Sequence, residues 1–335
     1  PEVLLGHLAA ETDEIRLGSG AVLLNHYSPF KVAEVFGALD GLAPGRIDAG
    51  LGRANGSPAS DRALGTERHV EDPDAAHRAR VEAVLNHLFD EFPEGHEYAG
   101  LSVPGSGEGP AEPWLLGSSP SSAELAADLG VPYCFAGFIR PQWAEHSFEA
   151  YHEAFQPSRG AGGVDEPVGM VAVNAVCAET DEEAARLRAV AEASHQRLRR
   201  GELGTTPSVE EAIDELGGVP DPTPETLDDD EWPRAISGSP ETMSGLLDQL
   251  ADRVGVEETA ATGSSLLGAY HRLPVNEDAD DDAGEDAVAV PGMTRRRVVG
   301  TLFLVIFLDL LGFGILIPVI PLYAKFFGAN EFVGS

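Results

Sequence analysis

Lysine is almost absent from this chain of 335 residues, and acidic residues far outnumber basic ones. Only Lys31 and Lys325 are lysines, and the other basic residues are arginines. Together the 22 basic and 56 acidic residues give a net charge of −34. Nucleic-acid binding requires a basic patch against the phosphate backbone, so we do not expect a nucleic-acid partner. Because salt screens self-repulsion on an acidic surface, the charge favours a halophilic source.

Cysteine is equally scarce, which excludes whole classes of site. Cys134 and Cys177 stand inside apolar runs, with neither metal-ligand spacing nor the pattern of a disulfide framework. We therefore expect reduced thiols in a cytoplasmic domain and no metal site. The chain also shows no signal-peptide pattern at its start. It opens at Pro1 in the middle of an apolar pattern, so we expect an N-terminal part to be missing.

The most informative stretch runs from residue 114 to residue 138. An apolar run breaks at Gly117, and Ser119 and Pro120 then stand at the N-cap and first helical positions of a helical pattern. A second apolar run follows, which indicates strand, turn, helix and strand. Free backbone N–H groups and hydroxyls at a helix start can bind an anion, most often phosphate. The alternative is that the serines only cap the helix. The hydroxyls concerned are Ser118, Ser121 and Ser122.

Strands alternate with helices through most of the chain. We expect strands at 15–24, 47–51, 114–116, 133–138 and 168–178, and helices at 28–41, 75–89, 120–130, 150–155, 180–200 and 239–250. This alternation predicts a parallel sheet, either doubly wound or an eight-fold barrel. In both folds the loops after the strands form the site, which points to residues 25–28, 52–58 and 117–122.

The composition changes sharply after Val256. Residues 257–292 hold nine acidic residues and one base, without sustained periodicity, and predict a flexible acidic linker. Residues 293–335 then carry a net charge of +2. Residues 298–324 form an apolar run long enough for a transmembrane helix, preceded by three arginines. A buried helix of a globular domain is the alternative.

Four separated motifs carry a resemblance to a known family. They are NHYSPFKVAE at 25–34, GRIDAGLGR at 45–53, the turn at 117–122 and ISGSPET at 236–242. Residues 3–250 resemble the luciferase-like flavin-dependent oxidoreductases. The resemblance implies a (β/α)8 barrel that uses reduced FMN, or in some branches a deazaflavin, with oxygen and a small organic substrate. A flavin reductase and a second copy of the chain are the candidate partners that it implies.

The resemblance also assigns roles to individual residues. Arg53 corresponds to the arginine that meets the flavin phosphate, and a surface ion pair is the alternative for it. Asn25 lies on a matching loop, and its neighbour His26 either touches flavin or substrate or caps local backbone. His69, His77 and His87 are expected to be solvated. The remaining phosphate-site residues that the resemblance implies are Gly117, Ser118, Ser121 and Ser122.

Two departures from the family pattern affect the expected architecture. The first two strands would precede Pro1, and the sequence after Val256 does not resemble the last strand and helix. We therefore expect an incomplete barrel over residues 1–256 with open sheet edges. The family's histidine-containing segment would also precede Pro1, so no catalytic residue other than His26 is suggested.

The C-terminal segment resembles a different family. Residues 307–324 are similar to the first transmembrane helix of major facilitator transporters, for which Met293 would be a natural start. Two neighbouring genes joined into one chain would explain this pattern. The alternatives to an active oxidoreductase are an inactive fragment anchored to the membrane through residues 298–324, or the N-terminal piece of a transporter.

Overall fold

The computed structural model describes most of the chain up to residue 263. Three predictions fall on residues outside the described ranges: the transmembrane segment, most of the linker, and the environment of His69. Among the described residues, no helix has the length and apolar character needed to cross a membrane. The described ranges are 2–53, 58–64, 70–103, 110–157, 160, 162–200, 202, 205–223, 227, 232–255 and 258–263.

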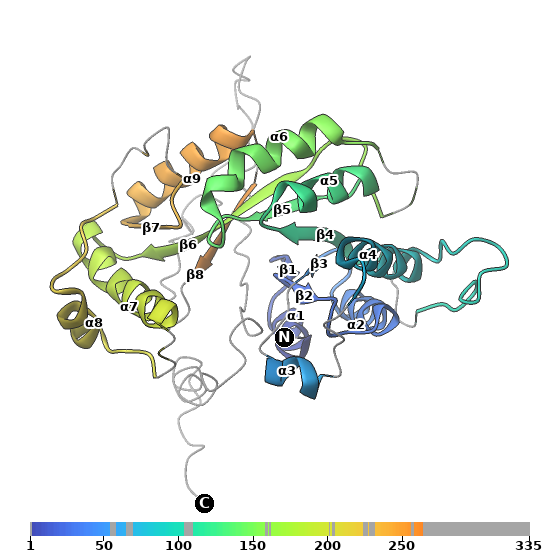
Figure 1. Cartoon of the computed structure of the whole chain (residues 1–335), viewed down its shortest axis with the longest axis horizontal. Helices are drawn as coiled ribbons and strands as arrows, with labels where there is room; N and C mark the ends of the chain where they lie inside the picture. The colour runs from blue at the N-terminus through green and yellow to red at the C-terminus, as the bar shows by residue number, and fades with distance from the viewer. Residues whose placement is uncertain are drawn as a thin grey trace, which may run out of the picture.

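The strands form one curved parallel sheet (Figure 1). Its central order is β1-β3-β4-β5-β6, with β2 also paired to β3. Every strand pair is parallel, as the alternation with helices predicts. The strands are β1 Leu17–Gly18, β2 Val22–Leu23, β3 Ile47–Gly52, β4 Glu112–Gly117, β5 Tyr133–Ala136, β6 Gly169–Cys177, β7 Ala235–Gly238 and β8 Glu258–Gly263.

Strand β6 pairs with three other strands. Met170 pairs with both β5 and β8, so these two strands lie on opposite edges of β6. Asn174 pairs with both β7 and β8, so β7 lies on the same edge as β5, further along β6. Strand β8 therefore extends the curved sheet, and β7 is a short addition beside the carboxyl-terminal half of β6.

The structure differs from the expected strands in three places. The strand expected at 15–24 is two short strands, and β7 was not predicted. Residues 258–263, which lie inside the linker predicted over 257–292, form the strand β8. Threonine and alanine fill this segment, so it lacks the large β-branched residues that mark a strand in a sequence. The predicted linker thus begins with a strand.

The helices form an arc outside the strands, from α2 and α4 on one side through α5, α6 and α9 to α7 and α8 on the other (Figure 1). The predicted helices are confirmed, although α6 begins six residues earlier than expected. They are α1 Glu2–Glu11, α2 Pro29–Leu42, α3 Pro58–Ala63, α4 Pro73–Phe89, α5 Pro120–Leu129, α6 Ala144–Ala154, α7 Asp181–Arg200, α8 Val209–Leu216 and α9 Pro240–Val254, with a 3-10 turn at Pro141–Trp143.

Alternation along the strands separates two apolar clusters. Leu115 of β4 and Phe135 of β5 belong to the main core, which also contains buried residues of the surrounding helices. Trp114 and Cys134, one residue earlier on each strand, belong to a smaller cluster with Met170. Successive side chains of a strand point to opposite faces, so the smaller cluster lies on the inner face of the sheet. The arrangement is an α/β half-barrel of parallel strands, consistent with the predicted barrel architecture.

Candidate functional site

A cavity of about 850 Å³ lies on the inner face of the sheet, and its lining extends to the loops after β3, β4 and β5. Glycines on β3 and β4 line this space and allow neighbouring segments to approach the strands closely. At Gly50 a Cβ atom would overlap the Ser19 carbonyl oxygen, so a side chain there would push the strands apart. The lining includes Gly50, Gly52, Arg53, His77, Trp114, Gly117, Ser118, Ser119, Ser121, Ser122, Cys134, Phe138, Arg140 and Met170.

The start of α5 forms one wall of the cavity. Ser119 is the N-cap, with an extended backbone (φ −154°, ψ 156°), and Pro120 is the first helical residue. The Ser122 hydroxyl donates to the Ser119 carbonyl oxygen (2.6 Å) and accepts from the Ser119 N–H (3.3 Å). The Ser119 and Ser121 hydroxyl oxygens lie 3.1 Å apart. The helix start is thus surrounded by hydroxyl groups, as the sequence predicts.

Gly117 and Tyr133 hold this turn in place. A Cβ atom at Gly117 would overlap the Ser122 side chain, so only glycine allows the helix start to approach the end of β4. The Tyr133 phenol oxygen lies 3.1 Å from the Ser122 hydroxyl and donates to the Ser119 carbonyl oxygen (3.4 Å). Burial raises the pKa of Tyr133, so the phenol stays neutral. The geometry of the turn is therefore fixed from beneath by β4 and β5.

Arg53 lines the same cavity directly after β3 and forms an ion pair with Asp74 in the first turn of α4. This is the surface ion pair that the sequence leaves open as the alternative to a phosphate contact. Both side chains remain substantially exposed, at 37% and 77%, so the pair is a weak surface interaction that an anionic ligand could replace. Arg53 therefore lines the cavity that the serines also face.

The prediction that His77 is solvated is wrong. The residue is 6% exposed, and its Nδ1 atom has no hydrogen-bond partner among the described residues. Burial, together with the charges of Arg53 and Arg80, lowers the pKa of His77 to about 4, so the ring is neutral near pH 7. His87 is also buried, at 4%. Because α4 is polar on average, sequence periodicity did not identify which of its histidines face inward.

Asn25 and His26 follow β2 but are not among the cavity-lining residues. The Asn25 side-chain oxygen accepts a long hydrogen bond from Arg80 (3.4 Å). The His26 Nε2 atom lies 3.8 Å from the Asp61 carboxylate of α3, and the two side chains are 5% and 1% exposed. The structure thus brings five of the seven predicted site residues together, and the other two contact Arg80 and Asp61 outside the cavity lining.

The inner wall of the cavity is apolar. Trp114 and Leu116 of β4, Met170 of β6 and Phe138 of the loop after β5 line it. The Trp114 indole nitrogen is buried, with no hydrogen-bond partner within the described ranges. Both cysteines are free, and the described residues contain no cluster of three His, Cys, Asp or Glu that could hold a metal ion. The cavity therefore combines a polar rim with an apolar interior, a common arrangement for small-molecule sites.

Comparison with sequence families gives a match to the luciferase-like monooxygenases over residues 1–258. The uncharacterised protein YceB of Bacillus subtilis is 37% identical over 260 residues, which cover 77% of this chain and 75% of YceB. A luciferase-like monooxygenase of Escherichia coli K12 is 39% identical over 215 residues, or 64% and 62% of the two chains. The aligned region thus spans less than two thirds of the latter relative.

Solved structures give the same picture. The structure of apo-MsnO8 is 39% identical, with a TM-score of 0.67 over 78% of this chain and 76% of MsnO8. The oxygenating constituent of 3,6-diketocamphane monooxygenase from Pseudomonas putida, solved with FMN, is 22% identical, with a TM-score of 0.50 over 78% and 76%. A coenzyme F420 dependent tetrahydromethanopterin reductase from Methanopyrus kandleri is 18% identical, with a TM-score of 0.55 over 79% and 82%. The last two likenesses concern the fold alone.

Proposed function

This chain belongs to the luciferase-like monooxygenase family, and from that premise we propose that it is a flavin-dependent monooxygenase using reduced FMN and oxygen on a small organic substrate. One observation carries the proposal. An arginine and a hydroxyl-rich helix start, which are far apart in the sequence, line one cavity at the carboxyl ends of β3 and β4. Guanidinium groups and helix N-termini are both suited to a phosphate.

The residues present fit the phosphate of FMN. Arg53 would provide a planar pair of donors, while Ser118, Ser121 and Ser122 would provide hydroxyls beside the first turn of α5. Gly117 would support the site indirectly, because it allows the start of α5 to approach the end of β4. His77, neutral and buried beside Arg53, would contribute a hydrogen-bonding group without adding charge. Asn25 and His26 lie outside this set of contacts, and their role would be to support it through Arg80 and Asp61.

The remaining work of the protein would be orientation and exclusion of water. Bound reduced flavin supplies the redox chemistry with oxygen. The apolar wall formed by Trp114, Leu116 and Met170 would hold the organic substrate against the ring and keep bulk water away. A deazaflavin is the alternative cofactor, because the same phosphate site would serve either molecule.

The proposed oxidoreductase unit includes the predicted domain 1–256 together with β8. Residues 264–292 as a linker and residues 298–324 as a membrane segment stay predictions, as does association into a homodimer. The test of the membrane prediction is to express the full chain and measure whether it partitions with the membrane fraction.

The test of the function is to titrate the full chain with FMN and with riboflavin, which lacks the phosphate, and to compare Arg53→Gln with wild type. We expect Arg53→Gln to weaken FMN binding about tenfold or more, because a charge-assisted pair to phosphate is lost. The affinity for riboflavin should stay unchanged. Arg62→Gln, an exposed arginine of α3 outside the cavity, is the matched control. Equal affinity of wild type for FMN and riboflavin would contradict the proposal.

A further inference from the structure

Three arginines line the cavity, and their partners differ. Arg53 is paired with Asp74, and Arg78 is paired with Asp128 of α5. The Arg140 side chain forms neither an ion pair nor a hydrogen bond with any described residue, and only its backbone carbonyl oxygen is bonded, to the Trp143 N–H (3.0 Å). Acidic residues outnumber basic ones by more than two to one in this chain. In so acidic a chain, most arginines are expected to have an acidic partner. An arginine that lines a cavity without one is therefore unusual.

Hydrogen bonds from Arg234, the residue before β7, fix the loop that carries Arg140. Arg140 follows β5, so it stands at the same end of the sheet as Arg53 and the serines. Arg234, next to β7, donates hydrogen bonds to the carbonyl oxygens of Phe138 (2.6 Å) and Ile139 (3.1 Å). Pro141 then begins a 3-10 turn. The side chain of Arg140 thus extends from an anchored backbone, which lowers the entropy cost of using it for binding.

The cavity below Arg140 is suited to an apolar group. Phe138, on the same loop, lines the cavity together with Trp114, Leu116 and Met170. Trp114 and Met170 are 6% and 2% exposed, so a ligand that reaches them leaves water. A ligand that uses both features has an apolar body and one anionic end.

We propose that Arg140 binds the carboxylate of an amphipathic organic acid whose apolar body lies in the cavity against Trp114 and Met170. The inference rests on the proposed function, because it names the class of substrate held beside the flavin. A guanidinium group accommodates a carboxylate through two parallel hydrogen bonds. The acidic surface of the chain repels organic anions. The Arg140 side chain, which has no acidic partner among the described residues, therefore determines where such an anion can bind.

The test uses two probes of matched shape, 4-phenylbutanoate and 4-phenylbutan-1-ol, which differ at the anionic end. Their binding to the full chain is measured by isothermal titration calorimetry, with and without FMN. We expect Arg140→Gln to weaken 4-phenylbutanoate binding about fivefold or more and to leave 4-phenylbutan-1-ol within about twofold of wild type. Arg140→Lys should retain part of the preference for the acid. Arg62→Gln, which makes the same change of net charge outside the cavity, should change neither affinity.

Three results would overturn the inference. The first is a wild-type chain that binds neither probe or binds both equally. The second is an Arg140→Gln variant that loses both probes to the same extent, because that outcome indicates a structural role. The third is an Arg140→Gln variant that loses FMN but keeps 4-phenylbutanoate, which would assign Arg140 to the flavin phosphate. Since FMN binding is measured separately, a failure of the proposed flavin site is distinguishable from a failure of the substrate site.

Discussion

Two helices of this protein begin in almost the same way and yet differ in what they can bind. Helix α5 follows Gly117 and helix α9 follows Gly238, and each has a serine N-cap followed by proline. At both starts the third helical residue carries a hydroxyl that packs on the last glycine of the strand. A Cβ atom at Gly238 would lie 2.7 Å from the Thr242 side chain, as one at Gly117 would overlap Ser122.

The difference is a carboxylate. At α9, Asp181 accepts hydrogen bonds from the Ser239 N–H (2.6 Å) and from the Thr242 hydroxyl (3.2 Å), and Glu241 occupies the second helical position. At α5 the second helical residue is Ser121, and no acidic residue occurs in its first turn. The Asp181 carboxylate thus binds the hydrogen-bond donors at the start of α9, whereas the start of α5 faces the cavity. The same local motif serves stability in one place and, as proposed, ligand binding in the other.

The largest effect is expected when α5 is made to resemble α9. Ser121→Glu places a carboxylate at the second helical position, where the flavin phosphate would bind. We expect FMN affinity to fall about 100-fold, because like charges repel at close range. The thermal midpoint should stay constant or rise, because an acid in the first turn favours the helix dipole. Fluorescence titration with FMN and a thermal melt measure the two quantities.

Ser121→Gln is the matched control, since it adds similar bulk without charge. It should lower FMN affinity far less than Ser121→Glu. If both variants lose the same affinity, bulk rather than charge excludes the ligand, and the contrast between α5 and α9 would not explain binding.

A smaller effect is expected from the two strand-end glycines. Gly117→Ala and Gly238→Ala each force a methyl group against a hydroxyl-bearing side chain, so each should destabilise the fold by about 1–3 kcal/mol. Only Gly117→Ala should also weaken FMN binding, because only that turn faces the cavity. Urea unfolding and FMN titration of both variants measure this. Loss of FMN affinity in both to the same degree would argue for a general loss of structure.

Removing the carboxylate at α9 should cost about 1 kcal/mol in the free energy of unfolding. The hydrogen bonds from Ser239 and Thr242 lower the pKa of Asp181. A lowered folded-state pKa means that the stabilisation is present above the unfolded pKa and is lost as pH falls through the folded value. The stability difference between wild type and Asp181→Asn should therefore shrink in strong acid. A constant difference from pH 7 to pH 2 would contradict this account, and FMN affinity should not change.

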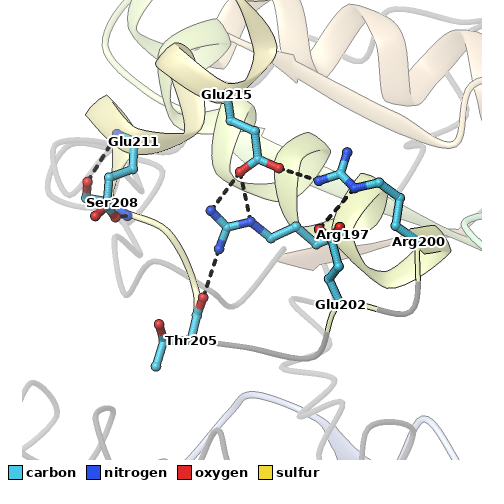
Figure 2. A network of polar contacts seen from close by, with 7 residues as sticks. All are labelled: Arg197, Arg200, Glu202, Thr205, Ser208, Glu211 and Glu215. Carbon is cyan, nitrogen blue, oxygen red and sulfur yellow. Dashed lines mark hydrogen bonds and ion pairs between the residues drawn. The ribbon is translucent and has the colours of Figure 1, made fainter.

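The smallest effect is expected in the exposed network between α7 and α8 (Figure 2). Glu215 accepts from Arg197 (2.8 Å) and Arg200 (2.6 Å), and these arginines lower the pKa of Glu215. Exposed pairs contribute little and are screened by salt. We expect Glu215→Gln to shift the thermal midpoint slightly in low salt and not measurably at molar salt. Retention of the wild-type fold without loss in low salt would count against a halophilic source.

Much of the fold follows from local patterns in the sequence. Three helices begin at Ser-Pro pairs, in which the serine is the N-cap and the proline is the first helical residue. The periodicity of α4 predicts that Val81 and Val84 are buried, and the structure confirms it. These features depend on neighbours within one turn of helix, so they can be recognised in a linear pattern. The serines at the start of α5 were recognised for the same reason.

Other features depend on contacts that the sequence does not display. The segment that forms β8 has too little apolar character to be recognised, and it is a strand because β6 offers it an edge. His77 lies on a polar helix and is buried because α4 packs beside the cavity. Arg140 resembles any surface arginine until the structure shows that it lines the cavity without a partner among the described residues.

The α/β class, the helix starts and the local chemistry of the turn at 117–122 can be predicted from the sequence, because periodicity and short-range hydrogen bonds decide them. Long-range packing determines which of two similar helix starts remains available. Asp181 is distant from Ser239 in the sequence and reaches it through the pairing of β6 and β7. The same holds for the site as a whole. Parallel strands bring their carboxyl ends together, and that placement sets Arg53, the serines and Arg140 around one cavity.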